Sequence, residues 1–168
     1  MKFYKTANMV CRGHELFSKS DDIVKPMPVD VSDIAGIRLM TRAEVIAFRD
    51  NAGAAGAREI LKYNGPWLTA DEGSRPDTRL CVAGPSEPWL WEEVDSQEDG
   101  IGIRPVLTLK HGIIPDEETG KTCVLFGEAS WLCVGRNLYL CEKTLWTDSF
   151  GDAGSMQKKL HKWLEDAA

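Results

Sequence analysis

The chain has 168 residues, of which 43% are hydrophobic and 27% are charged, and its formal net charge at pH 7 is −6. These proportions are typical of a globular protein with a packed core, and they argue against a disordered or fibrous chain. The negative charge argues against direct binding to nucleic acid or to an anionic membrane. The length suits one folding unit, so we expect a single domain over residues 1–168.

The apolar runs and the cysteines of the sequence indicate the cellular compartment of the protein. No run reaches the roughly 18 to 20 apolar residues that a membrane span needs, and residues 1–10 lack the apolar centre of a signal peptide. The cysteines are odd in number, stand among apolar residues and show no C-x-x-C spacing: Cys11, Cys81, Cys123, Cys133 and Cys141. We therefore expect reduced, buried thiols in a cytoplasmic protein that holds no metal and no other cofactor.

In chain order, the first eleven residues predict a strand, and the polar residues 12–36 predict a long irregular segment. Thr41-Arg42-Ala43-Glu44 has the form of a capping box, so a helix should begin there. Its buried side would carry Val45, Ile46 and Phe48. A second helix is predicted over residues 54–63, where Asn64-Gly65 and the following proline end it.

After residue 66 the pattern changes to short apolar runs between Gly, Pro, Ser and Asp, which indicates a sheet with irregular loops over 67–69, 80–83 and 89–94. The clearest strand is 101–109, where Ile101, Ile103, Leu107 and Leu109 share one face at period two. Pro105 has no backbone N–H, so we expect an edge, a bulge or an unpaired position there.

The last third of the chain predicts a strand over 121–126, a hairpin of 130–134 and 137–141, and a final helix. The helix is indicated by apolar residues at helical spacing: Met156, Leu160, Trp163 and Leu164. The predicted fold class is therefore α+β, with a small mixed or antiparallel sheet and flanking helices.

Three segments carry a resemblance to a known family: Pro66-Trp67-Leu68-Thr69, the hairpin region 80–94, and the run from Gly102 to Leu109 that contains Arg104-Pro105. They resemble the tryptophan-leucine strand, variable hairpin and closing strand of uncharacterised bacterial and phage domains with a C-type-lectin-like fold. Two further similar segments, 126–140 and 146–164, follow the closing strand, whereas the family has them before it. The resemblance implies a C-type-lectin-like domain in permuted order that displays ligand contacts on long loops, and it implies no reaction.

No pattern indicates catalysis, so we expect a protein that is not an enzyme. The three histidines, His14, His111 and His161, are far apart, and no serine stands in a Gly-x-Ser-x-Gly elbow. Formylglycine-generating enzymes share the broader fold and use a cysteine pair at a copper site, but strand cysteines such as Cys123 and Cys133 are more often buried hydrophobes. The calcium ligands of sugar-binding lectins are incomplete here, because Trp89 follows Glu87-Pro88 where those lectins have asparagine.

The candidate binding site is an aromatic pair, spaced by two positions and followed by a run of acids. An aromatic pair surrounded by charge is typical of an interaction hot spot, and the predicted site comprises Trp89, Trp91, Glu92, Glu93, Asp95, Glu98 and Asp99. We expect a non-enzymatic binding module of microbial or phage origin that recognises a protein or a glycan. The alternative is a small acidic phage-encoded inhibitor that blocks a basic site on a host nucleic-acid-handling protein in the host cytoplasm. A third hypothesis is an enzyme whose site carries no sequence signature. For the two tryptophans themselves, the alternative is a structural role of both in the core.

Overall fold

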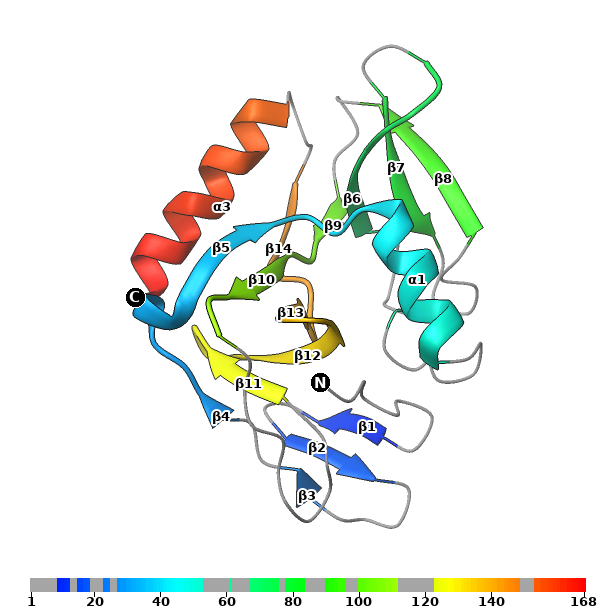
Figure 1. The fold of residues 1–168 in the computed structure, drawn as a ribbon. Helices are drawn as coiled ribbons and strands as arrows, with labels where there is room; N and C mark the ends of the chain where they lie inside the picture. Colours follow the sequence, from blue (N-terminus) through cyan, green and yellow to red (C-terminus); the bar gives the residue numbers. More distant parts are fainter. Residues whose placement is uncertain are drawn as a thin grey trace.

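The structure, a computed structural model, is built mainly of strands. It describes residues 9–12, 15–18, 23–24, 27–52, 61, 67–75, 78–83, 90–95, 100–111, 123–148 and 153–168. Within these residues there are three sheets, a short 3-10 helix (Val31–Asp33) and two α-helices, α1 (Arg42–Ala52) and α3 (Ala153–Ala167), whose arrangement can be followed in Figure 1. Neither of these helices has an apolar stretch of the length needed to cross a bilayer.

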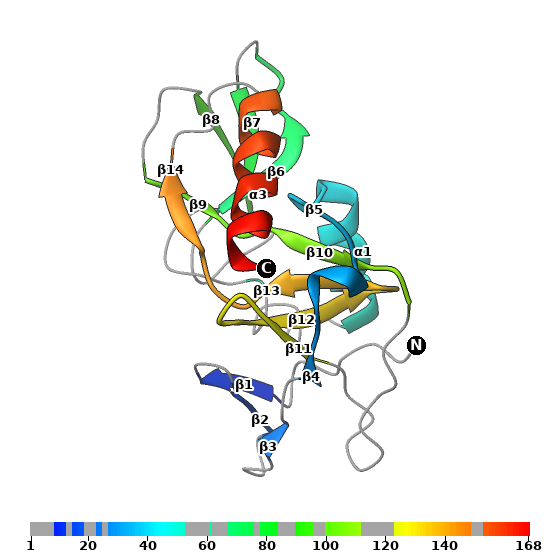
Figure 2. The ribbon, with the colours of Figure 1, turned by 90° about the vertical axis from the view of Figure 1, so that its left-hand side faces the viewer.

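The largest sheet has six strands and curls into a half-barrel (Figures 1 and 2). From edge to edge the strands are β4 (Met27–Pro28), β11 (Cys123–Phe126), β12 (Ala129–Gly135), β13 (Leu138–Cys141), β10 (Val106–Leu109) and β5 (Ile34–Arg38). All neighbours are antiparallel except β4 and β11. The predicted hairpin over 130–141 is confirmed as β12 and β13. The central strands β12 and β13 are buried on both faces, and their residues belong to one hydrophobic core that also includes residues of the second sheet and of both α-helices.

The second sheet has five strands among the described residues. Its order is β14 (Trp146–Asp148), β9 (Ile101–Ile103), β6 (Trp67–Glu72), β7 (Thr78–Ala83) and β8 (Leu90–Asp95). Only the β6–β9 pair is parallel. A third, antiparallel sheet comprises β1 (Met9–Arg12), β2 (Glu15–Ser18) and β3 (Ile23–Val24).

The predicted strand 101–109 is divided between the two larger sheets. β9 ends at Ile103 and β10 begins at Val106, so the chain crosses from one sheet to the other at Arg104 and Pro105. The expected interruption at Pro105 is confirmed, because proline has no N–H for the ladder. The expected single buried face is wrong, since every residue from 101 to 107 is buried.

A buried arginine occupies this crossing point. Arg104 is 1% exposed. Its Nε donates to the Cys141 carbonyl oxygen at 2.6 Å, and its Nη1 donates to the Leu61 carbonyl oxygen at 3.1 Å. Its Cζ lies 5.4 Å from the centre of the Trp67 ring, within the range of a cation–π contact. Arg104 thus satisfies carbonyls of separate segments where the two sheets meet.

The sequence predicted where α1 begins and which side of α3 is buried, and the structure agrees on both points. In α1 the capping box is confirmed: the Glu44 N–H donates to the Thr41 hydroxyl at 3.1 Å, and the Thr41 N–H donates to Glu44 Oε1 at 3.0 Å. α1 packs against β6 and β12. α3 lies along β5 (Figure 1), and its Trp163 ring stands 6.0 Å from Phe126 and 5.8 Å from Trp131, centre to centre.

The predicted α+β class is wrong, because the described residues are sheet-rich and their principal sheet is a curled half-barrel. One source of the error is segment 12–36, which was expected to be irregular but contributes β2, β3, β4 and the start of β5. Another is 101–109, which serves two sheets instead of one. Of the second predicted helix, 54–63, only Leu61 lies among the described residues.

Candidate functional site

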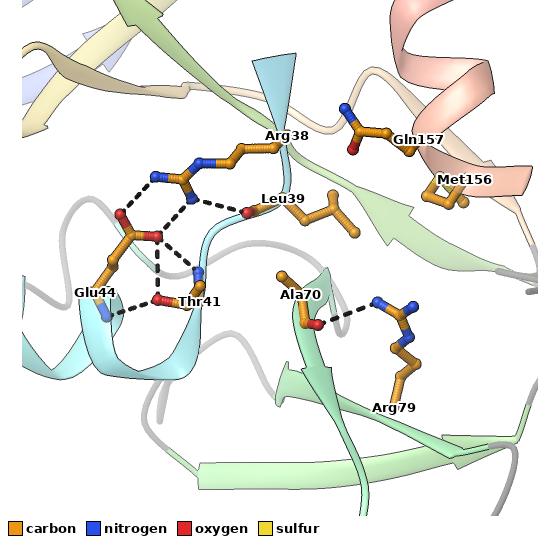
Figure 3. A pocket seen from close by; sticks show the side chains of 8 residues that line it. All are labelled: Arg38, Leu39, Thr41, Glu44, Ala70, Arg79, Met156 and Gln157. Atoms are coloured by element: carbon orange, nitrogen blue, oxygen red, sulfur yellow. Dashed lines mark hydrogen bonds and ion pairs between the residues drawn. The ribbon is translucent and has the colours of Figure 1, made fainter. Parts of the chain in front are cut away.

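A groove of about 440 Å³ opens between the start of α1, the first turns of α3 and the β6–β7 pair (Figure 3). Its walls combine two arginines, one carboxylate, a glutamine and an apolar floor. The lining residues are Arg38, Leu39, Thr41, Glu44, Ala70, Arg79, Met156 and Gln157. A volume of this size lies within the range of small-ligand sites in proteins.

Arg38 and Glu44 form an ion pair on one side of the groove. Arg38 Nη1 and Nη2 donate to the two Glu44 carboxylate oxygens at 2.7 and 2.8 Å, and Nη1 also donates to the Leu39 carbonyl oxygen at 3.2 Å. Such a forked contact holds both side chains in one geometry. The side chains of Arg38 and Glu44 are 39% and 27% exposed, so the pair stands at the rim of the groove.

The Glu44 carboxylate already accepts hydrogen bonds from Arg38 and Thr41. Burial raises the pKa of Glu44, but hydrogen bonds from Arg38 and Thr41 outweigh it and hold the pKa below its ordinary value. The hydrogen bond to Glu44 likewise raises the pKa of Arg38. Both groups are therefore charged at neutral pH. Because its oxygens are hydrogen-bonded and its pKa is lowered, Glu44 is poorly suited to act as a general base.

The second arginine lines the groove from β7. Arg79 is 9% exposed, and its Nη1 donates to the Ala70 carbonyl oxygen on the neighbouring strand at 3.2 Å. In Figure 3 its guanidinium extends from β7 toward Met156 and Gln157. Leu39 and Met156, which are 4% and 2% exposed, supply apolar surface beside it.

Gln157 closes the groove from α3. Its Nε2 donates to the Ile37 carbonyl oxygen at 2.9 Å and lies 3.1 Å from His161 Nε2. Because β5 is the last strand of its sheet, this bond satisfies a carbonyl on an edge strand. The groove therefore presents oriented guanidinium and amide groups over an apolar floor, which suits recognition of a polar ligand.

Of the predicted binding residues, Glu93 has a defined structural role. Its carboxylate accepts hydrogen bonds from the Ser74 N–H and hydroxyl, both at 2.6 Å, and from Arg75 Nε at 3.2 Å. The hydrogen bonds from Ser74, and then the hydrogen bond and the charge of Arg75, hold the pKa of Glu93 below its ordinary value. Gly73 is required beside it, because a Cβ there would lie 2.2 Å from Thr78 Oγ1. Glu93 thus ties β8 to the turn that follows β6.

The other predicted site residues are described only in part. Asp95 is exposed and lies opposite Thr78 at one end of the β7–β8 pair. Trp91 and Glu92 belong to β8, and their backbones pair with those of Val82 and Cys81 in β7. The side chains of Trp91 and Glu92 lie outside the described part of the structure. The remaining three, Trp89, Glu98 and Asp99, lie outside the described residues altogether. The predicted hot spot therefore stays a prediction, placed on or beside an edge strand.

Sequence reasoning missed the groove. Arg38, Arg79 and Gln157 come from positions far apart in the chain, and each alone looks like an ordinary surface residue. The capping box at Thr41 and Glu44 was the one local signal near the groove, and it indicates a helix start rather than a ligand. Among the described residues no group of three His, Cys, Asp or Glu converges to hold a metal ion.

No known protein family, no curated protein and no solved structure matches this chain. The resemblance to C-type-lectin-like domains therefore stays a prediction from the sequence.

Proposed function

We propose that the chain is a non-enzymatic binding module that recognises a protein partner along the outer edge of β8. The observation that carries this proposal is the position of β8. It is the last strand of its sheet, it pairs with β7 over all six of its residues, and no described strand pairs with its other side. A strand edge presents backbone N–H and C=O groups that an extended segment of a partner can pair with.

The charge of β8 favours a basic partner. The strand contains Glu92, Glu93 and Asp95 and no basic residue. Two copies of such a strand repel one another, so the acids oppose edge-to-edge pairing of this protein with itself. A segment that carries lysine or arginine at alternate positions would be attracted instead.

The anchoring of Glu93 also supports the proposal. Because the turn at Ser74 and Arg75 holds its carboxylate, one end of β8 is ordered before any partner arrives. A pre-ordered strand loses less conformational entropy when it binds. Asp95 is exposed at the same end.

The alternative is an acidic inhibitor in which the carboxylates compete for a basic site on a nucleic-acid-handling protein, without strand pairing. The run of acids from Glu92 to Asp99 favours it. The two proposals differ in what they require from the backbone, because strand addition uses main-chain hydrogen bonds and charge competition does not.

The test uses the full chain and a fluorescent six-residue peptide that alternates lysine and valine. We expect saturable binding by fluorescence anisotropy, and we expect weaker binding by a copy N-methylated at alternate positions on the edge that pairs. Replacing Glu92 and Asp95 with Gln and Asn should weaken binding roughly tenfold, whereas Glu165→Gln on the exposed face of α3 should not change it.

Three outcomes would contradict strand addition. The first is equal affinity of the methylated and unmethylated peptides combined with a steep loss of affinity in high salt, which supports the charge-competition alternative. The second is no binding by either peptide. The third is an equal effect of the β8 variant and the Glu165→Gln control, which would mean that only the total charge matters.

A further inference from the structure

A second cavity, the turn pocket, lies between the end of α3, the turn that joins β11 to β12, and the segment that follows β4. It is lined by residues 29–31, 125–128 and 167–168, and its volume is about 410 Å³, within the range of small binding sites. These elements lie away from β8 in both ribbon views (Figures 1 and 2). The turn pocket is therefore a surface separate from the outer edge of β8.

Exposed apolar side chains gather at the turn pocket. Met27 and Val31 are 45% and 44% exposed, and they are the large hydrophobic side chains that stand exposed in the part of the chain that the structure describes. Val31 lines the pocket itself, together with Val29 and Phe126, which pack in or against the hydrophobic core. Apolar side chains that cluster beside a cavity favour a surface that a partner covers.

The backbone beside the turn pocket offers no donors for strand addition. The Val29 N–H donates to the Leu125 carbonyl oxygen at 3.1 Å, so it faces β11. Residues 28 and 30 face the other way, because successive residues of an extended chain direct their N–H groups to opposite sides. Pro28 has no N–H, and the Asp30 N–H already donates to Asp33 Oδ2 at 2.9 Å. A partner at this place is therefore held by its side chains.

The rim of the turn pocket is negatively charged. Asp30 and Glu128 line the pocket and are exposed, and the Asp33 carboxylate lies beside Asp30. Lys143, whose Nζ donates to the Glu128 carbonyl oxygen at 3.5 Å, offsets part of this charge. Among these four groups the carboxylates outnumber the ammonium, so an excess of negative charge remains next to the apolar surface. Charge complementarity therefore favours a partner that is basic beside an apolar group.

We infer that the turn pocket is a docking site for a peptide segment of another protein that carries an aliphatic side chain between basic residues. The aliphatic side chain enters the pocket against Val31 and Phe126, and the basic residues face Asp30 and Glu128. A second copy of this chain is a less suitable occupant, because its net charge of −6 adds to the negative rim. The inference does not depend on strand addition at β8.

The experiment is a titration of the full chain, labelled with ¹⁵N, with the peptide acetyl-Lys-Leu-Lys-amide, followed by NMR. Two control peptides separate the contributions: acetyl-Lys-Ser-Lys-amide lacks the aliphatic side chain, and acetyl-Glu-Leu-Glu-amide reverses the charge. We expect saturable shifts at residues 29–31 and 125–128 with the first peptide, and affinity weaker by roughly fivefold or more with each control. Equal affinity of either control peptide, or an absence of shifts at the turn pocket, would overturn the inference.

Two variants test the site itself. Val31→Ser removes apolar surface at an exposed position, so it should weaken binding of acetyl-Lys-Leu-Lys-amide roughly fivefold with little change in melting temperature. Glu128→Asn removes a charge and should weaken binding by about as much, and asparagine suits the φ of +59° at this position. Glu72→Gln, which removes an equal charge at an exposed position on β6, should leave the affinity unchanged. Undiminished binding by folded Val31→Ser, or an equal effect of Glu72→Gln and Glu128→Asn, would overturn the inference.

Two further measurements distinguish the peptide from other occupants. 3-Methylbutylamine combines an aliphatic body with one ammonium group, and if it binds as tightly as acetyl-Lys-Leu-Lys-amide, the turn pocket is a site for a free amine and the inference is wrong. Spectra of the chain alone at increasing protein concentration test the second copy. Shifts at residues 29–31 and 125–128 that grow with concentration would show that the chain covers its own pocket, whereas unchanged spectra and tighter binding of the peptide support the inference.

Discussion

The ion pair and capping box at Glu44 make a prediction with a definite size. Glu44→Gln keeps the length of the side chain and one acceptor oxygen, but it removes the charge that faces Arg38 and the start of α1. Because the pair is partly exposed, its contribution to the free energy of unfolding is about 0.2–1 kcal/mol. A negative charge in the first turn of a helix adds about 0.3–1 kcal/mol. We therefore expect Glu44→Gln to lower the free energy of unfolding by about 0.5–2 kcal/mol at pH 7.

The dependence on pH follows from the pKa of Glu44. Hydrogen bonds from Arg38 and Thr41 outweigh burial and place the pKa in the folded state below the ordinary value of 4.5. A carboxyl group with a depressed pKa stabilises the fold above its unfolded pKa, and this contribution is lost as the pH falls through the folded pKa. The stability difference between wild type and Glu44→Gln should therefore be complete at pH 7 and shrink as the pH falls below about 4.5.

The assay is urea unfolding of both proteins at several pH values between 7 and 3, with Glu165→Gln as the control for removal of an exposed charge. The control should change the free energy of unfolding by less than about 0.5 kcal/mol. A stability difference near zero at pH 7, or one that stays constant down to pH 3, would refute the reasoning.

Two further predictions concern the core. Gly127 has a φ of +59°, and a Cβ there would lie 2.8 Å from the Trp163 ring. We therefore expect Gly127→Ala to lower the free energy of unfolding by about 2–3 kcal/mol, as measured by urea unfolding. Gly100→Ala, with φ of +78° and open space around it, should cost only about 1 kcal/mol, and equal costs would contradict a role for Trp163. Burial raises the pKa of Cys141 from 9.0 to about 12, so the folded state binds more protons above pH 9. Stability should fall there by up to about 1.4 kcal/mol per pH unit, and Cys141→Ala should make this decline shallower, whereas an unchanged slope would contradict the assignment.

Local patterns in the sequence predicted local structure well. The capping box at Thr41 marks the start of α1, the spacing of Met156 and Leu160 marks the buried side of α3, and Pro105 marks the break between β9 and β10. Each of these signals acts between residues at most four positions apart. Such interactions form the same way whatever the rest of the chain does, so they can be read without a structure.

Pairing over long distances was decided only by the tertiary structure. β4 lies in the segment expected to be irregular, and it is a strand because it pairs with β11, about one hundred residues later. Arg104 is buried because carbonyls of Leu61 and Cys141 meet it at the crossing of the sheets. Glu93, predicted as a ligand residue, holds the turn at Ser74.

For the candidate sites too, the sequence determined one part and the tertiary structure the other. The sequence by itself determined an acidic chain with an aromatic and acidic run over 89–99, and the structure places part of that run on an edge strand. The groove had no signal in the sequence, because Arg38, Arg79 and Gln157 meet only after two sheets and a helix have packed. Periodicity reports which face of an element is buried, whereas burial between elements decides which distant side chains share a cavity.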